Sequence, residues 1–328
     1  MTRPDKINEY FNSRGFTVVC ALMLAIAAGV SVTLSPPPVP DAGSGILYSA
    51  QWSAIKQPTL SAALNVVCII GIGLLMLALN KVFNFVRSFT FIFASVFFLL
   101  EMSTPLTCSI FNTGTTLCLI LMGGILLLFS SYQDKHSQHS IFLLTAVLTT
   151  CSMFQYAFLL LIPAFCFGFM YMRAMTIKGF LAMLLGLLTP LWIVMGLGIA
   201  HLTDFKPFGI NAIWESLDLG QVRMLVVTAA SATLLTIVLT AMNMLTIMNY
   251  RLQLRVYNAF FVLMSLLAII AMAIDYKDMT AFLPILFLCL SVQVAHSYTL
   301  STFSHRYLFI IALIALAIAS CVAQLLPV

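Results

Sequence analysis

Long apolar stretches, separated by short segments that carry most of the charged residues, recur along almost the whole of this 328-residue chain. Most of them have about 17 to 25 residues, the length that a helix needs to cross roughly 30 Å of hydrocarbon. Only 8% of the residues are charged, against about a quarter in a typical soluble chain. The stretches are continuously apolar and lack a period of two, which predicts helices rather than barrel strands. We therefore predict an all-α, polytopic transmembrane helical bundle that forms a single integral membrane domain over residues 1–328.

The number of crossings depends on residues 140–172, which contain no charge. They are too many for one upright helix and few for two full spans. If this stretch folds as a short intramembrane hairpin near Gln155, the Lys and Arg residues divide 11 to 4 between the two sides, and if it crosses once they divide 9 to 6. The positive-inside rule favours the hairpin, with the N-terminus cytoplasmic and the C-terminus outside. About eleven spans are then expected, at residues 16–34, 60–79, 88–104, 114–130, 140–153, 156–172, 179–201, 222–248, 256–274, 279–297 and 307–326.

Several kinds of site are not expected. The eight cysteines almost all lie in apolar runs and form no CxxC pair, so neither a disulfide framework nor a zinc site is predicted. His136 and His139 form an HxxH pattern in a polar loop, which we interpret as solvated rather than metal-binding. We expect no metal and no cofactor. The net charge of +5 lies mainly in short loops, where it orients the spans, so the expected partner is the lipid bilayer and not nucleic acid.

Two loops on the predicted outer side, at residues 35–59 and 202–221, are long enough to hold structure. Trp52 in the first and Trp214 in the second lie among acidic and small residues, a composition typical of an interfacial helix. The first loop begins with PPPVP, which favours an extended spacer, and Asp41 follows it. Two interpretations of Asp41 stay open: it ends the spacer before a short helix, or it is a functional carboxylate.

Polar residues inside the spans are the other candidates for a site. Glu101 is expected near the outer end of the third span, where its carboxyl is either functional or solvated at the membrane surface. Gln155 lies at the apex of the predicted hairpin. Gln293 and His296 lie one turn apart on one face of the tenth span. These three either line a polar cavity, as substrate-binding residues, or pack between helices.

Asparagines also occur inside the spans. Asn65 lies in the second span and Asn243 in the eighth. In a membrane, such side chains usually hydrogen-bond to a neighbouring helix. We therefore predict that both residues have a packing role.

Two segments carry a resemblance to known proteins. LNKVFNFVRSFTFIFASVFFLLEMSTP is similar to the second and third spans of the C-type glycosyltransferase superfamily, and SIFLLTAVLTTCSMFQYAFLLLIPAFCFGFMYMRAMTIKGFLAMLLGLLTP is similar to its intramembrane hairpin and following helix. The same segments, together with FLPILFLCLSVQVAHSY, resemble a family of uncharacterised bacterial polytopic membrane proteins. The likeness covers most of residues 58–298 and consists of apolar texture with scattered Asn, Gly and Pro. It implies a multi-pass protein of the bacterial inner membrane.

The resemblance also implies a reaction. The superfamily transfers sugars from polyprenyl-phosphate carriers and usually employs an outer-loop Asp as catalytic base. That role falls to Asp41, with Glu101 as a second catalytic candidate. Lys56 is the basic residue that the same loop offers to a lipid phosphate. Asp41 has no acidic neighbour, so the loop lacks the metal-binding acid pair that often accompanies the base.

The sequence is therefore compatible with three functions. The first is a glycosyltransferase-like protein of cell-envelope glycan or glycolipid assembly, either active on a polyprenyl-phosphate-linked sugar or a relative that has lost catalysis. The second is a non-enzymatic scaffold or partner subunit that binds other membrane subunits of an envelope or secretion complex. The third is a small-molecule transporter, although the sequence contains no clear pair of inverted repeats.

Overall fold

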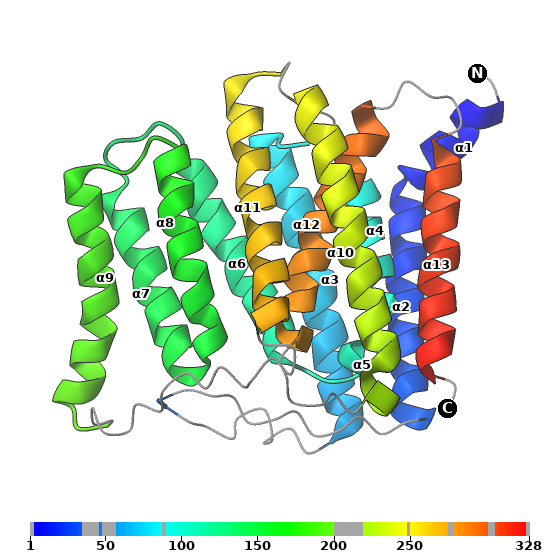
Figure 1. The fold of residues 1–328 in the computed structure, drawn as a ribbon, viewed down its shortest axis with the longest axis horizontal. Coiled ribbons are helices and arrows are strands. Elements are labelled where there is room, and N and C mark those ends of the chain that lie inside the picture. Colours follow the sequence, from blue (N-terminus) through cyan, green and yellow to red (C-terminus); the bar gives the residue numbers. More distant parts are fainter. Residues whose placement is uncertain are drawn as a thin grey trace.

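The computed structural model describes residues 3–34, 46–47, 57–86, 90–199, 219–247, 250–274, 279–300 and 306–325. Within these ranges most of the backbone is helical and no strand is formed. The long helices run along one common direction, and the two chain ends lie at opposite ends of the bundle (Figure 1). We call these the N-terminal end, where α2 begins, and the C-terminal end, where α13 finishes. The elements are α1 Arg3–Phe11, α2 Arg14–Leu34, α3 Pro58–Phe83, α4 Ile92–Met102, α5 Pro105–Cys108, α6 Thr113–Ser130, α7 Gln138–Phe154, the 3-10 turn η2 Tyr156–Leu160, α8 Leu161–Tyr171, α9 Ile177–Gly196, α10 Leu219–Ile247, α11 Leu252–Ile274, α12 Met279–Leu300 and α13 Tyr307–Leu325.

Eight of these helices are long and apolar enough to cross a membrane, namely α2, α3, α6, α9, α10, α11, α12 and α13. The remaining three predicted spans are shorter apolar helices: α4, α7 and the segment Tyr156–Tyr171. The prediction of an all-helical, multi-pass membrane fold is therefore confirmed. The count of about eleven crossings and the cytoplasmic N-terminus stay predictions.

Local sequence signals explain where several helices begin and end. Pro58 occupies the first turn of α3, where a missing N–H costs no hydrogen bond. Asn84 ends the same helix in the left-handed conformation, with φ 48°. Asn112 and Thr176 cap α6 and α9, because each side-chain oxygen accepts a hydrogen bond from a main-chain N–H in the first turn.

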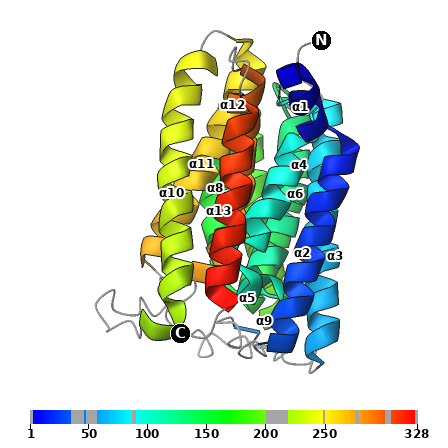
Figure 2. The ribbon, with the colours of Figure 1, turned by 90° about the vertical axis from the view of Figure 1, so that its right-hand side faces the viewer.

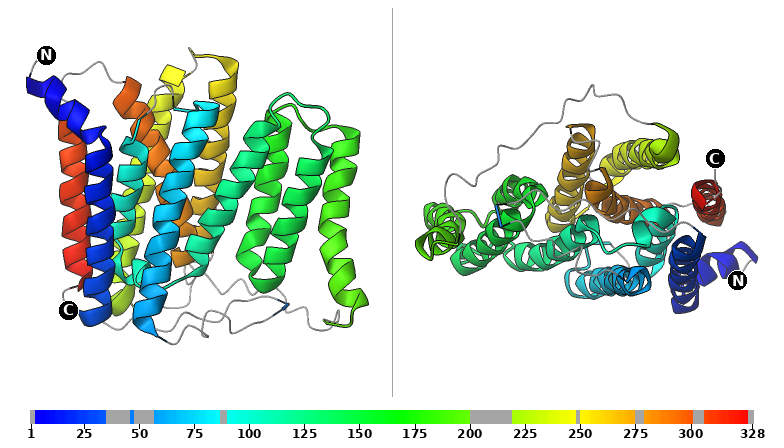
Figure 3. Two further views of the ribbon diagram at one scale, coloured as in Figure 1. Left: turned by 180° about the vertical axis from the view of Figure 1, so that it is seen from behind. Right: turned by 90° about the horizontal axis from the view of Figure 1, so that it is seen from below.

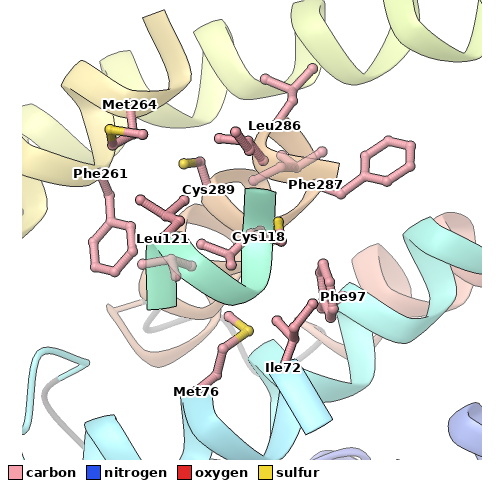
Figure 4. Packing of buried hydrophobic residues seen from close by; sticks show 14 of the residues in the cluster. Ile72, Met76, Phe97, Cys118, Leu121, Phe261, Met264, Leu286, Phe287 and Cys289 are labelled. Carbon is pink, nitrogen blue, oxygen red and sulfur yellow. The ribbon is translucent and has the colours of Figure 1, made fainter. Parts of the chain in front are cut away.

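The centre of the molecule is α12, which packs against α4, α6, α10 and α11. Residues along Met279–Thr299 are almost entirely buried inside the protein. Figure 4 shows this core, where Leu286, Phe287 and Cys289 of α12 lie close to side chains from the neighbouring helices. In Figure 2, α13 lies between α10 and α2 and covers one side of the bundle.

Helices α7, α8 and α9 form an extension at one end of the long axis, far from α1, α2 and α13 (Figure 3). The helix break that the sequence predicts is present, because α7 ends at Phe154 and η2 begins at Tyr156. At the N-terminal end the two arms of this hairpin are joined by a hydrogen bond from the main-chain N–H of Gln133 to the carbonyl oxygen of Met172, 2.9 Å long. The loops before α7 and after α8 therefore lie on the same side.

Candidate functional site

The first predicted outer loop reaches the apex of the α7–α8 hairpin. Asp41 and Lys56 lie outside the described residues, as do most of residues 35–59 and of the second loop, 202–221. Ile46 and Leu47 are described, and the main-chain N–H of Leu47 donates to the carbonyl oxygen of Met153 at 2.8 Å. This contact brings the loop that carries Asp41 next to the last turn of α7.

Gln155 lies directly beside this contact, between the end of α7 and η2. Its main-chain N–H continues the helical pattern to Cys151, but its backbone is extended, with φ −149° and ψ 118°. The side chain is 5% exposed, and its Oε1 has no hydrogen-bond partner among the described residues. A buried amide oxygen of this kind is costly unless something donates to it, so the hairpin apex offers an unused acceptor.

The third predicted span, residues 88–104, corresponds to α4, which is shorter than expected because it begins only at Ile92 and ends at Met102. It begins at the N-terminal end, where the main-chain N–H of Phe91 donates to Asn12 Oδ1 at 2.8 Å and Ser95 bonds Thr17 of α2 at 2.8 Å. Its 11 residues extend about 16 Å, whereas the hydrocarbon layer is roughly 30 Å thick. Glu101 lies in the last turn of α4, two residues before Ser103, which accepts a hydrogen bond from Gln324 in the last turn of α13. The end of α4 is therefore closer to the C-terminal end of the bundle than to its N-terminal end.

The turn after α4 explains why this helix is short. Thr104 precedes Pro105, and a residue before proline is driven out of the helical region. Thr104 accordingly has φ −124° and ψ 70°, and the short helix α5 starts at Pro105. The break coincides with residue 104, where the predicted third span ends.

Glu101 is 3% exposed, so its carboxyl lies inside the protein. Oε1 has no hydrogen-bond partner in the described part of the chain, and Oε2 lies 4.0 Å from Cys108 Sγ. The nearby donors are used elsewhere: Thr104 Oγ1 and Cys108 Sγ both donate to the main-chain oxygen of Glu101, at 3.1 and 2.8 Å. A charged side chain at the centre of a membrane helix costs about 2.5 to 3.5 kcal/mol on insertion.

Neighbouring helices hold the α4–α5 break with polar side chains. From α3, Asn65 Nδ2 donates to the carbonyl oxygens of Thr107 and Cys108, at 3.2 and 2.9 Å, and its Oδ1 accepts from Thr115 Oγ1 of α6 at 2.6 Å. The packing role predicted for Asn65 is thus confirmed.

A second helix holds the end of α4 from the other side. Ser320 Oγ and Gln324 Nε2 of α13 donate to the carbonyl oxygen of Ser103, at 3.1 and 3.0 Å. Thr228 of α10 lies in the same cluster, because its hydroxyl bonds Ser320 at 2.7 Å and accepts from Gln324 Nε2 at 3.1 Å. The sequence analysis missed these residues, since single Ser, Thr and Gln residues in apolar helices carry no signal of their partners.

Gln293 joins a separate network in α12, about 21 Å along that helix from its start at Met279. Its Oε1 accepts from Asn243 Nδ2 of α10, and its Nε2 donates to Asn258 Oδ1 of α11, both at 2.9 Å. The predicted packing role of Asn243 is confirmed by this bond and by a further bond to the Gln293 carbonyl oxygen at 2.8 Å. With both ends of its amide bonded, Gln293 joins three helices.

His296 lies one turn further along α12 and is 1% exposed. Its Nε2 has no hydrogen-bond partner within the described ranges. Gln293 and His296 lie toward the N-terminal end of the bundle and Gln155 lies at its C-terminal end, so the structure does not bring these three candidates together. No three His, Cys, Asp or Glu side chains of the described residues are placed to hold a metal ion.

No family model, curated protein or solved structure matches the chain. Two places in the molecule are therefore the candidates for a functional site. One is the contact between the first outer loop and the hairpin apex at Gln155, and the other is the buried carboxyl of Glu101 at the α4–α5 break.

Proposed function

We propose that the chain is a multi-pass protein of the bacterial inner membrane that acts at the outer surface on a polyprenyl-phosphate-linked sugar, in cell-envelope glycan or glycolipid assembly. The observation that carries this proposal is the hydrogen bond from Leu47 to Met153. It places Leu47 next to the apex of the hairpin; Leu47 belongs to the outer loop to which the resemblance to C-type glycosyltransferases assigns the catalytic base, and the hairpin is part of the same resemblance.

The distribution of charge supports the orientation. In the described part of the chain most basic residues are near the N-terminal end of the bundle, for example Lys6, Lys81 in the last turn of α3, and Lys178 in the first turn of α9. Such an excess is typical of the cytoplasmic side. The C-terminal end, with Gln155 and Leu47, then faces outward.

In this proposal the chemistry belongs to the loop and the hairpin apex. Asp41 takes the proton from the acceptor hydroxyl as the sugar is transferred, which requires hydrogen-bond reach of that hydroxyl. Lys56 holds the lipid phosphate by charge, and Gln155 offers its free Oε1 to a sugar hydroxyl. Glu101 is enclosed between helices and takes no part in this reaction.

The proposal is tested in a strain that lacks the gene, complemented with the wild type, with Asp41→Asn or with a control, Asp134→Asn. Asp134 lies at the opposite end of the bundle, in the loop before α7, where Asn keeps the oxygen that accepts from the His136 N–H. Polyprenyl-linked sugars are then measured by mass spectrometry. We expect a polyprenyl-linked intermediate to accumulate in the deletion strain. The wild type and Asp134→Asn should clear this intermediate, and Asp41→Asn should not. Clearance by all three proteins, or no accumulation in the deletion strain, contradicts the proposal.

The position of Glu101 favours transport as the second candidate function. Many transporters bind their substrates and coupling ions where helices are interrupted inside the membrane, and Glu101 lies at an interruption between α4 and α5. If a solute changes the thiol labelling of a Gln155→Cys variant while polyprenyl-linked sugars stay unchanged in the deletion strain, this second function replaces the first.

A further inference from the structure

Glu101 has no strong hydrogen-bond donor to stabilise a negative charge. A carboxylate accepts several hydrogen bonds, because its two oxygens carry about four lone-pair positions. Here Oε1 has no partner in the described part of the chain and Oε2 has only the thiol of Cys108, 4.0 Å away. That thiol lies closer to the main-chain oxygen of Glu101, at 2.8 Å, so its single hydrogen is already used.

The hydroxyl groups beside it are used in the same way. Thr104 Oγ1 donates to the main-chain oxygen of Glu101 at 3.1 Å, and Thr107 Oγ1 donates to Thr104 at 2.8 Å. Ser103 Oγ donates to the carbonyl oxygen of Leu100 at 2.6 Å. Each of these hydroxyls has one hydrogen, so none of the three is left for the carboxyl.

No described cation compensates the carboxyl either. Helix α4 packs against α2, α3, α5, α12 and α13. Arg14 is the first residue of α2 and its guanidinium lies over the Phe91 ring, at the N-terminal end, and Lys81 is in the last turn of α3, at the same end. His296 of α12 is also toward that end. The titratable groups that interact with Glu101 are two thiols, Cys108 of α5 and Cys118 of α6. These two thiols in turn interact with two further thiols, Cys321 of α13 and Cys289 of α12.

We propose that Glu101 is a proton-binding site inside the membrane, and that it carries its proton in the folded protein. A protonated carboxyl removes the charge, and the hydroxyl that it gains on Oε2 faces the sulfur of Cys108 as a weak acceptor. The proton lies at the α4–α5 break, enclosed by the neighbouring helices, and an ionisable side chain inside a membrane-spanning bundle is rare and usually functional. The inference does not depend on the proposed sugar chemistry, in which Glu101 has no role.

The proton is detected by infrared difference spectroscopy on the purified full chain in lipid at neutral pH. The spectrum of Glu101→Gln is subtracted from that of the wild type, so that one carboxyl differs. We expect the difference to contain the carbonyl stretch of a protonated carboxyl. Loss of the carboxylate stretches instead would show that Glu101 is ionised and would overturn the proposal. Glu101→Met, neutral and similar in size, replaces the Gln variant if that one does not fold.

A second measurement needs no variant. Dicyclohexylcarbodiimide enters membranes and reacts with protonated carboxyls: the acid adds across one C=N bond, its proton passes to nitrogen, and the acyl group then migrates to give a stable acylurea. Peptide mapping is expected to place the adduct on Glu101. An adduct that forms on Glu101 but is prevented by sodium ions at constant pH would mean that a monovalent cation, and not a proton, occupies the site, and would also overturn the proposal.

Discussion

The main-chain N–H of Gln133 lies 2.9 Å from the carbonyl oxygen of Met172. Met172 is the last residue of the uncharged stretch that governs the span count, and Gln133 lies in the loop before that stretch, so the stretch returns to the side from which it started. The break at Gln155 makes this return possible.

The first prediction concerns this hairpin. Cysteines placed at Lys135 and Lys178, in the loops on either side of it, should be labelled from the same side of the membrane. Labelling of intact and permeabilised cells with an impermeant maleimide checks this. Opposite accessibilities at the two positions would mean that residues 140–172 cross the membrane once.

The close packing of α7 on α9 gives a second prediction. A Cβ at Gly186 would overlap Thr145 Oγ1 and lie 2.7 Å from the carbonyl oxygen of Phe142. Gly186→Ala should therefore destabilise the protein by about 1 to 3 kcal/mol, a typical cost of overpacking. Gly123→Ala is the matched control, because nothing lies within 4 Å of a Cβ there. Thermal unfolding in detergent measures both, and equal melting temperatures for the two variants would contradict the packing described.

A third prediction tests how the α4–α5 break is held. Asn65→Leu removes three hydrogen bonds and takes away the side-chain donor to the Cys108 carbonyl oxygen, which costs about 1 to 3 kcal/mol. The Thr107 carbonyl oxygen keeps the hydrogen bond from Asn112 Nδ2 at 2.9 Å. Thr150→Val serves as the comparison, since Thr150 is exposed and bonds only within its own helix; its effect should stay within about 0.5 kcal/mol. Unfolding by denaturant in mixed micelles gives both values. A stable Asn65→Leu protein would show that these bonds contribute little.

Substitutions of Gln293 and His296, which are both buried and lie one turn apart on α12, should affect stability differently. Gln293→Met breaks the amide bridge to α10 and α11 and should lower the melting temperature. His296→Phe replaces a ring whose Nε2 has no described partner, so stability should be kept or raised. If His296→Phe is instead folded but inactive, His296 has a functional role that its contacts do not indicate.

The sequence was sufficient to predict where the helices lie, because the apolar runs and the short charged segments between them mark the helix positions directly. It also predicted the break at Gln155, since a charge-free stretch of that length fits neither one span nor two. The end of α4 was predicted to within two residues, because the expected span stopped at residue 104, before Pro105. Its start at Ile92, four residues later than expected, was not predicted, because residues 88–91 continue the apolar run.

The candidate site was predicted less well. Glu101 was identified, but its depth and its lack of donors depend on Thr104, Thr107 and Cys108, whose hydrogen bonds are set by the turn after α4. For Gln155 and His296 the sequence left open a polar cavity or packing between helices, and the two residues lie toward opposite ends of the bundle. Their separation follows from tertiary packing, which residue types alone do not encode.

The proposed outer site requires the C-terminal end of the bundle to be the outer surface, because Leu47 and the hairpin apex at Gln155 both lie there. The most direct test is a pair of C-terminal fusions in cells, one to alkaline phosphatase and one to green fluorescent protein. We predict an active phosphatase and a dark fluorescent protein. A fluorescent fusion with inactive phosphatase would place this end in the cytoplasm and contradict the proposed outer site.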